Sequence, residues 1–515
     1  MRHAVRARDP QPGERRDSYA RHRPEATVLY QTLAEHWPAF LEQAEETGGL
    51  PRFVVREFEE YLRCGILGHG CLHLVCRCCG YSQLVARSCK RRGFCPSCCG
   101  RRMADTAVHL EQGVLPAVRI RHWICTLPWG LRALLGYDRE LCAEVVRAFA
   151  TELDRSLRWR AKRELDLDSV ARAHTGSVVA IQRTDSALRL NVHLHVLSLD
   201  GVYVRDPAGE LVFHELPTPT HAEVAEVARR TAERIEQILR AHGRSLDPEL
   251  AQDEPHLLCL DEPGLAACYA AAAQGISLTG DRAGRPTLRL IVPRDKVEAP
   301  AGEVDADPPV AEVRGVNVHA KQVVDGRDRN QLERLCRYIT RPPVGQDRLE
   351  RRADGRLELT LKKAWRDGTR ALVLEPHELI TRLIAAIPPP GFHLLRYFGV
   401  LSSHSSLRAQ VVPEPPADCT AHQPPPAAGD QLPLFAEGDA DERPARRKRW
   451  AWLLKHVYAA DLDNCPRCGG PMRWLDFVTA PDELARLLAA HGLGPQPPPR
   501  AQEPPRGQLR LPLGA

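Results

Sequence analysis

The stretch Asn191-Val192-His193-Leu194-His195-Val196-Leu197 alternates polar and apolar side chains, a pattern that predicts a β-strand. His193 and His195 then share one face of the strand, with Cα atoms about 6.5–7 Å apart. Neutral imidazole is a common ligand of divalent metals, so the pair predicts a metal site. A half-buried strand with two solvated histidines is the alternative interpretation.

A second run, residues 177–185, precedes this strand and predicts an antiparallel hairpin with residues 188–199. The hairpin would place Gln182 close to the histidines, as a third metal ligand or as a residue that positions the site. A further strand is expected over residues 118–127. Helices are expected over residues 26–46, 51–63, 139–163 and 221–242.

The composition and hydrophobic pattern argue against a membrane-spanning or secreted protein. With 515 residues, of which 43% are hydrophobic, the chain has material for about three or four domains. The net charge is only +5, so a basic binding surface must be local. No apolar run is long enough to span a bilayer and no signal peptide is evident, so we expect a cytoplasmic protein without a membrane partner.

Nine of the 17 cysteines lie between residues 64 and 99, which in such a chain favours metal binding over disulfides. Two Cys-x-x-Cys turns stand 15 residues apart in this cluster, a spacing typical of tetrahedral structural zinc sites. The predicted zinc ligands are Cys76, Cys79, Cys95 and Cys98. Residues 72–77 and 81–88 would form a zinc-ribbon-like hairpin around them.

The remaining cysteines leave two questions open. Cys64, His69 and Cys89 could hold a second ion, whereas reduced core cysteines are the alternative interpretation of the whole cluster. Residues 87–102 contain several basic side chains and no acidic one, which indicates a phosphate-backbone contact or, alternatively, a protein-contact module. The candidate DNA contacts are Arg91, Arg92, Arg101 and Arg102.

Residues 328–340 predict a helix that ends before the Arg-Pro-Pro sequence at 341–343. Tyr338 lies in its last turn, and three arginines flank it, at Arg334, Arg337 and Arg341. A lone tyrosine at a helix end usually packs with its hydroxyl in water. These arginines, however, would favour phenolate and attract a phosphodiester, which makes Arg337 and Arg341 candidate DNA contacts.

Three segments together resemble the rolling-circle insertion-sequence transposases of the IS91 type, which are HUH endonucleases. They are the histidine strand with residues 199–203, the segment 335–343, and the block 88–98. The likeness runs in order from about residue 26 to residue 408 and extends to residues 465–470. It implies an α+β fold: an HUH-type catalytic domain with a central antiparallel sheet flanked by helices, preceded by a helical and zinc-ribbon-like N-terminal domain.

The resemblance also implies roles for individual residues. His193 and His195 would bind a catalytic Mg²⁺ or Mn²⁺, and Tyr338 would be the nucleophile that forms a 5′-phosphotyrosine and frees a 3′-hydroxyl. Several family members carry a second tyrosine four residues earlier, where this chain has Arg334, so it resembles the single-tyrosine subgroup. The expected partners are single-stranded element ends, the host replication machinery and further copies of the chain.

Two other functions stay open from the sequence. A zinc-dependent DNA-binding regulator without catalysis would make the histidines incidental. A plasmid rolling-circle replication initiator or relaxase would share the chemistry and differ in its DNA. A distance above about 12 Å between the Tyr338 hydroxyl and both imidazoles would favour the regulator, since one metal-bound phosphate must bridge these groups.

The expected domain organisation has six segments. They are a flexible basic arm (1–24), a helical and zinc-binding DNA-binding domain (25–115), the catalytic domain (116–401) with an insertion around 244–312, a Pro-rich linker (402–443), a C-terminal helical segment (444–493) and a disordered tail (494–515). Cys465 and Cys468 in the C-terminal segment are half a zinc site. Completion would need Cys419, a histidine or another chain.

Overall fold

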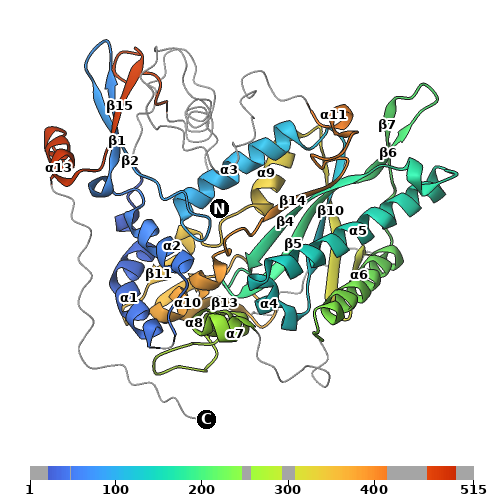
Figure 1. Ribbon diagram of the computed structural model, residues 1–515, viewed down its shortest axis with the longest axis horizontal. Helices are drawn as coiled ribbons and strands as arrows, with labels where there is room; N and C mark the ends of the chain where they lie inside the picture. Colours follow the sequence, from blue (N-terminus) through green and yellow to red (C-terminus); the bar gives the residue numbers. More distant parts are fainter. Residues whose placement is uncertain (1–20, 47, 246–256, 293–307, 414–460, 495–515) are drawn as a thin grey trace. The chain divides into compact units, whose positions relative to one another are not determined.

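The computed structural model describes residues 21–46, 48–245, 257–292, 308–413 and 461–494 (Figure 1). Most of the expected basic arm, residues 246–256 and 293–307 of the expected insertion, residues 414–460 with Cys419, and nearly all of the expected tail lie outside these residues. The described chain forms two compact units. Unit 1 contains residues 21–25, 63–89 and 461–494, and unit 2 contains residues 26–62 and 90–413.

A six-stranded antiparallel sheet is the centre of unit 2, with the strand order β14-β4-β5-β3-β10-β9. Its strands are β3 (Arg119–Thr126), β4 (Gly176–Thr184), β5 (Leu190–Leu199), β9 (Val310–Val313), β10 (Val316–Asp325) and β14 (Leu395–Gly399). The predicted hairpin is confirmed, because β4 and β5 pair with Gln182 opposite His193. The α+β class with a central antiparallel sheet is confirmed as well.

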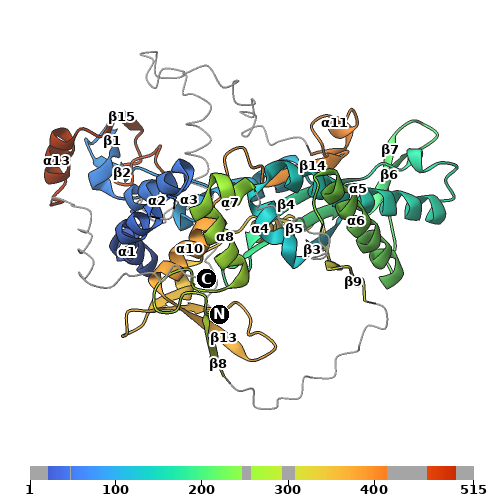
Figure 2. The same cartoon turned by 60° about the horizontal axis from the view of Figure 1, so that its bottom comes forward.

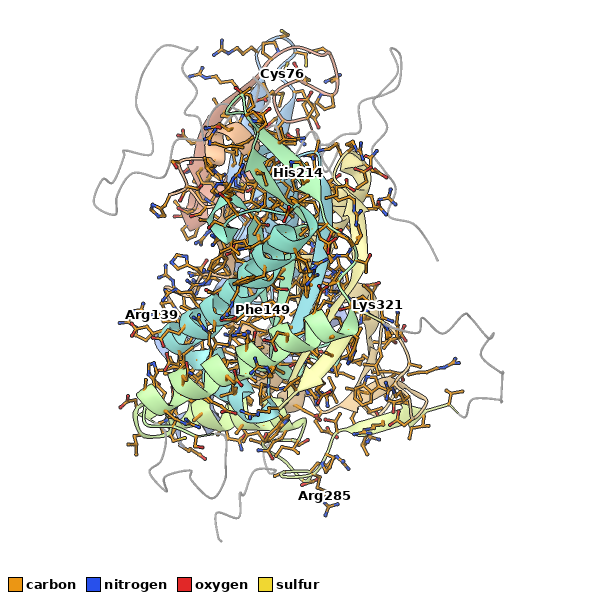
Figure 3. The ribbon with its side chains drawn as sticks, turned by 90° about the vertical axis from the view of Figure 1, so that its right-hand side faces the viewer. Cys76, Arg139, Phe149, His214, Arg285 and Lys321 are labelled. Carbon is orange, nitrogen blue, oxygen red and sulfur yellow. The ribbon has the colours of Figure 1, made fainter. Side chains whose placement is uncertain are left out.

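Two long helices, α5 (Arg139–Glu164) and α6 (His221–Ala241), lie side by side and pack against strands of this sheet (Figure 3). Asp138 caps α5 by accepting hydrogen bonds from the backbone N–H groups of Glu140 and Leu141. A capping box of Thr220 and Glu223 begins α6. Phe149, labelled in Figure 3, belongs to α5 and is fully buried.

Helices α3 (Pro96–Gly113) and α9 (Arg329–Ile339) cover the face of β5 that carries the odd-numbered side chains. Leu197 and Leu199 of β5 share one buried cluster with Leu110 of α3 and Leu335 of α9. His193 and His195 have the same parity as these leucines. The packing of α9 therefore brings its C-terminal end to the face of the sheet on which the histidines stand.

The rest of unit 2 is built from shorter elements (Figure 2). The helices are α1 (Val28–Glu45), α2 (Arg52–Arg63), α4 (Arg132–Tyr137), α7 (Leu257–Asp261), α8 (Pro263–Gln274), α10 (Pro376–Ala386) and α11 (Arg408–Val411). A four-stranded sheet contains β11 (Leu349–Arg351), β12 (Leu357–Thr360), β13 (Thr369–Leu374) and β8 (Leu288–Ile291), and a ribbon pairs β6 (Gly201–Arg205) with β7 (Leu211–Glu215). The short 3₁₀ helices of unit 2 are Trp129–Leu131, Val170–Arg172 and Gln346–Arg348, whereas Leu67–His69 belongs to unit 1 and Pro24–Ala26 includes residues of both units.

The region expected as an insertion contributes to the fold where it is described. Helix α8 packs on α10, and β8 pairs with β13 at the edge of the four-stranded sheet. These segments therefore belong to the packed structure of unit 2.

Unit 1 is a three-stranded antiparallel sheet with the order β15-β1-β2. The strands are β1 (Cys71–Cys76), β2 (Ser82–Ala86) and β15 (Met472–Val478), and helix α13 (Pro481–Ala490) follows β15. The predicted pairing of residues 72–77 with 81–88 is confirmed by β1 and β2. Strand β15 was not predicted, and it joins residues far apart in the sequence.

Among the residues that the structure describes, no helix is both long and apolar enough to cross a bilayer.

Candidate active site and zinc sites

His193 and His195 stand on β5 with exposed fractions of 8% and 2%, so they are buried rather than solvated. Their ring centroids are 5.1 Å apart. A third imidazole, His122, comes from the neighbouring strand β3, and its ring stacks on His195 at 5.1 Å between centroids. The site therefore contains three histidines rather than the two that were predicted.

Hydrogen bonds define the protonation of these rings. His193 Nδ1 lies 2.7 Å from the backbone oxygen of Asn191 and must donate to it, which leaves Nε2 with the lone pair. His122 Nδ1 donates to Oε1 of Gln322 at 3.0 Å, so its Nε2 accepts from Nδ1–H of His195 at 2.9 Å. His195 Nε2 consequently carries a lone pair.

Burial keeps these imidazoles neutral. Desolvation lowers the pKa of His122 and of His193, and it lowers the pKa of His195 to about 2. Nε2 of His195 is buried and has no hydrogen-bond partner among the residues that the structure describes. A neutral imidazole with a buried, unpartnered lone pair fits a divalent cation, and the lone pair of His193 supplies a second ligand.

Tyr338 lies in the last turn of α9, as predicted, and it is 43% exposed. Asp328 caps the start of this helix by accepting from the backbone N–H of Gln331. The Tyr338 ring centroid is 5.5 Å from that of His195 and 6.0 Å from that of His122, edge-on to both. Because the Tyr338 hydroxyl lies within one ring length of its own ring centroid, its distance from His195 is well inside the limit of about 12 Å that would favour a regulator without catalysis.

Gln182 links the sheet to this tyrosine. Its Nε2 donates to the backbone oxygens of Tyr338 at 3.2 Å and of Ile339 at 2.9 Å. The last carbonyl groups of a helix lack partners within the helix, so Gln182 supplies two of the missing donors for α9. The expected position beside the histidines is confirmed, while a role as a metal ligand stays a prediction.

The three arginines around Tyr338 have different partners. Arg341 stacks its guanidinium over the Tyr338 ring, with Cζ 4.3 Å from the centroid. Arg337 forms an ion pair with Glu333 at 2.7 Å, four residues earlier on the helix. Arg334 donates from Nε to the backbone oxygen of Asn330. Arg341 therefore places a positive charge against the ring of Tyr338, and the DNA contacts of Arg337 and Arg341 stay predictions.

A cavity of about 140 Å³ opens beside the end of α9. Its lining includes Gln182 and residues 339–343, which follow Tyr338 directly. The cationic side chains of the lining are Arg92, Arg102, Arg183, Arg341, Arg348 and Lys362. Asp185 is the carboxylate in this lining, and it pairs with Arg189 at 2.8 Å. The cavity is therefore positively charged and suits a phosphate or a nucleotide.

The arginines predicted as DNA contacts near α3 differ in their exposure and in their hydrogen-bond partners. Arg92 is half-buried and donates to the backbone oxygens of Phe392 at 3.0 Å and Pro389 at 3.5 Å, so part of its guanidinium supports the fold. Arg102 is exposed and donates to the backbone oxygen of Lys90. Arg91 and Arg101 are partly exposed. DNA binding by these residues stays a prediction.

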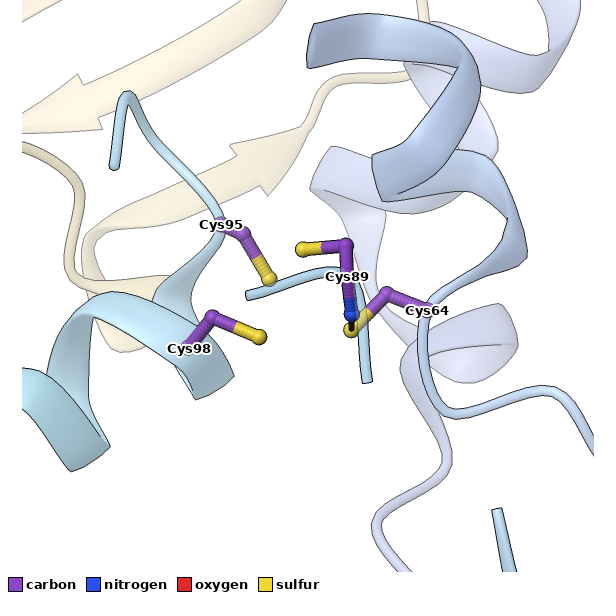
Figure 4. A group of neighbouring side chains, drawn as sticks. All are labelled: Cys64, Cys89, Cys95 and Cys98. Atoms are coloured by element: carbon purple, nitrogen blue, oxygen red, sulfur yellow. Dashed lines mark hydrogen bonds between the residues drawn. The ribbon is translucent and has the colours of Figure 1, made fainter. Parts of the chain in front are cut away.

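The structure corrects the predicted zinc ligand set. Cys95 and Cys98 group with Cys64 and Cys89, and the four ligand atoms lie within 4.8 Å of one another (Figure 4). The backbone N–H of Cys89 lies 3.3 Å from Sγ of Cys64, and that of Lys90 lies 3.3 Å from Sγ of Cys98. Buried sulfurs with backbone N–H partners fit a structural zinc ion.

The other predicted turn has different partners. Cys76 and Cys79 group with Cys465 and Cys468, and again the four ligand atoms lie within 4.8 Å of one another. The single predicted set of Cys76, Cys79, Cys95 and Cys98 is wrong, because a Cys-x-x-Cys spacing defines one turn and does not define which second turn comes close. Cys64 and Cys89 were considered for a second ion, but His69 is not in either group.

Sequence reasoning missed His122 and Gln322. The strand that carries His122 was predicted, but its neighbours were not. Strand β3 lies between β5 and β10, which come from distant parts of the chain. The available signal in the sequence was a polar side chain within the strand predicted over residues 118–127. In the structure this side chain, His122, is only 2% exposed.

Two family models and a relative match this chain. A family model described as a putative transposase matches residues 176–408, which include the histidine pair and Tyr338. A model described as a transposase zinc-binding domain matches residues 32–127. The transposase for insertion sequence element IS801 of Pseudomonas savastanoi pv. phaseolicola is 24% identical over 383 residues, covering 72% of this chain and 75% of that protein. No solved structure matches.

The fold and these matches define the class first: a transposase of an insertion sequence, which acts on DNA and carries a zinc-binding domain ahead of its transposase domain. Within that class, the two family models and the likeness to the IS801 transposase support an IS91-type transposase.

Proposed function

We propose that this transposase cleaves and joins single-stranded DNA at the ends of its insertion sequence, with Tyr338 as the nucleophile, in rolling-circle transposition of the HUH type. One observation carries the proposal: the Tyr338 ring lies 5.5 Å from His195, whose buried Nε2 has no hydrogen-bond partner in the described chain. A phosphate placed between them would meet an attacking oxygen and a metal-ligating nitrogen together.

The reaction is a transesterification. The Tyr338 oxygen attacks the scissile phosphorus, the bond to the 3′ oxygen breaks, and the phenol proton is balanced by the proton that the freed 3′-hydroxyl gains. The 5′ end remains joined to Tyr338 as a phosphotyrosine. A 3′-hydroxyl that attacks this phosphotyrosine later reverses the step and joins the strands without an external energy source.

Several residues of the chain support this step. Mg²⁺ or Mn²⁺ held by His193 and His195 would polarise the phosphodiester as a Lewis acid. His122 and Gln322 fix the tautomer and orientation of His195 through the hydrogen bonds described above. Arg341, stacked on the Tyr338 ring, brings a permanent positive charge to the position where the phosphate gains charge.

The substrate is inferred from the surroundings of Tyr338. The nucleophile is exposed at a helix end next to a positively charged cavity, and an unpaired strand can pass its backbone and one base into such a site. A replication initiator or relaxase shares this chemistry, but the match to an insertion-sequence transposase favours transposition. Host replication or another copy of the chain would complete transposition, and a cytoplasmic location stays a prediction.

A labelled oligonucleotide tests the proposal. The wild-type chain should form a covalent adduct with the 5′-phosphate side of a cleaved single strand in Mg²⁺ or Mn²⁺, detected on a denaturing gel. Tyr338→Phe removes only the nucleophilic oxygen and should abolish the adduct. Tyr137→Phe is the matched control and should leave the adduct intact.

The metal requirement is tested separately. His193→Ala and His195→Ala should abolish cleavage while binding of the uncleaved oligonucleotide persists. A covalent adduct with Tyr338→Phe, or full cleavage in EDTA, would show that the proposed active site is wrong.

A further inference from the structure

The second cysteine group, formed by Cys76, Cys79, Cys465 and Cys468, is only half contained in the matched zinc-binding domain: Cys76 and Cys79 lie within residues 32–127, whereas Cys465 and Cys468 lie far beyond them. Cys76 and Cys79 follow β1, whereas Cys465 and Cys468 precede β15. Strands β1 and β15 pair antiparallel with Cys76 opposite Met472, which brings the two turns together. All of these residues belong to unit 1.

The sulfur positions distinguish a metal site from disulfides. Sγ of Cys76 is 3.5 Å from Sγ of Cys468, and Sγ of Cys79 is 3.7 Å from Sγ of Cys465. A disulfide would need about 2.05 Å. Four sulfurs at about 2.3 Å from a tetrahedral zinc stand about 3.8 Å from one another, which is close to the separations observed.

The two turns also have the same backbone structure. The N–H of Cys78 lies 3.4 Å from Sγ of Cys76, and the N–H of Arg467 lies 3.4 Å from Sγ of Cys465. A glycine with positive φ follows each turn, Gly80 at +68° and Gly469 at +74°.

Backbone hydrogen bonds repeat as well. The N–H of Cys76 donates to the oxygen of Tyr81, and the N–H of Cys465 donates to the oxygen of Gly470, each at 2.7 Å. Two equivalent Cys-x-x-Cys-Gly turns that face each other through their sulfurs form the pattern of a zinc ribbon.

The hydrophobic core of this module is small. It consists of two clusters of six buried residues each: the one next to the sulfurs contains Leu74, Cys76, Val85, Leu462, Cys465 and Met472, and the other contains Leu67, Cys71, Leu84, Val478, Leu484 and Leu488. A core of this size rarely stabilises a domain alone, and small domains commonly depend on a structural metal. The two turns are separated by 386 residues along the chain from Cys79 to Cys465, so an ion here would also close a very long loop.

We propose that Cys76, Cys79, Cys465 and Cys468 bind a second structural zinc ion, which joins residues 63–89 and 461–494 into one discontinuous zinc ribbon. The C-terminal Cys-Pro-Arg-Cys sequence is therefore completed within its own chain, by the turn after β1. The chain holds two zinc ions, one in each cysteine group.

Metal analysis of the purified full chain tests the stoichiometry. The wild-type chain should contain two zinc ions, and Cys465→Ser/Cys468→Ser should contain one. Cys78→Ser is the matched control, because Cys78 is exposed, lies between two of the ligands and is in neither group, so this variant should keep two ions. One zinc in the wild-type chain, two in the double variant, or iron in place of zinc would overturn the proposal.

A second experiment does not depend on how the variants fold. A site for a specific protease is inserted between residues 413 and 461 of the otherwise wild-type chain, and the chain is cut there. The C-terminal fragment should co-elute with the rest of the protein in zinc and separate after a zinc chelator is added. Separation before chelation, or co-elution that persists after zinc is removed, would show that zinc does not join the two segments.

Discussion

Replacement of Gln182 separates two roles that the sequence could not distinguish. Its Nε2 donates to the backbone oxygens of Tyr338 and Ile339 at 3.2 and 2.9 Å. A neutral hydrogen bond contributes about 0.5–1.5 kcal/mol net, so the pair holds the end of α9 with about 1–3 kcal/mol. Because about 1.4 kcal/mol corresponds to a tenfold change in an equilibrium constant, the population of correctly placed Tyr338 should fall about 5- to 150-fold when both hydrogen bonds are removed.

Two substitutions of Gln182 distinguish a role in positioning Tyr338 from a role as a metal ligand. Gln182→Leu removes both donors and any ligand atom, whereas Gln182→Glu removes the donors but retains a carboxylate that could bind a cation. If Gln182 positions Tyr338, both variants should lower the single-turnover cleavage rate at saturating Mn²⁺ by similar factors. The Mn²⁺ concentration for half-maximal rate should not change.

The assay is single-turnover cleavage of a labelled oligonucleotide across a series of Mn²⁺ concentrations. A ligand role predicts a different result: Gln182→Leu would raise the half-maximal Mn²⁺ concentration, and Gln182→Glu would restore or lower it. That outcome, with an unchanged rate at saturation, would refute the positioning role.

Three further predictions concern other parts of unit 2. His122→Ala should lower the affinity for Mn²⁺, and so raise the Mn²⁺ concentration for half-maximal cleavage, by about 10- to 100-fold, because it removes the acceptor that orients His195. An unchanged Mn²⁺ titration would contradict this. Asp200→Ala should lower the free energy of unfolding in urea by about 3–5 kcal/mol, because it leaves the buried Arg121 without its carboxylate at 2.7 Å; a loss below about 1 kcal/mol would argue against it. Burial and the charges of Arg341 and Arg348 lower the pKa of Lys362 to about 8, so its charge is lost as pH rises from 7 to 9. Binding of single-stranded oligonucleotide should weaken over that range, and Lys362→Arg should remove this part of the pH dependence.

Local patterns predicted much of the fold correctly. The alternation around His193 predicted β5, and the run before it, residues 177–185, predicted the pairing that sets Gln182 opposite His193. The helix that ends before Pro342 placed Tyr338 in its last turn. Each of these features depends on neighbours in the sequence, so hydrophobic period and helix-ending signals were sufficient.

The features that were missed depend on pairs of distant segments. The order of strands put β3 beside β5 and so brought His122 to His195, across 73 residues. Strand β15 brought Cys465 to Cys79 in the same way. Spacing within a Cys-x-x-Cys turn shows that the turn can bind zinc, but the second pair of ligands is selected by the tertiary fold.

The position one helical turn before Tyr338 constrains how the proposed reaction can end. Arg334 occupies it, is exposed, and donates to the backbone oxygen of Asn330 on its own helix. Because residues four apart lie on one face of a helix, a tyrosine there would stand beside Tyr338, and arginine cannot replace its nucleophilic oxygen. In the proposed mechanism each chain therefore holds one covalent 5′ end at a time. The second strand transfer must then use the freed 3′-hydroxyl, and a second covalent end would require another copy of the chain.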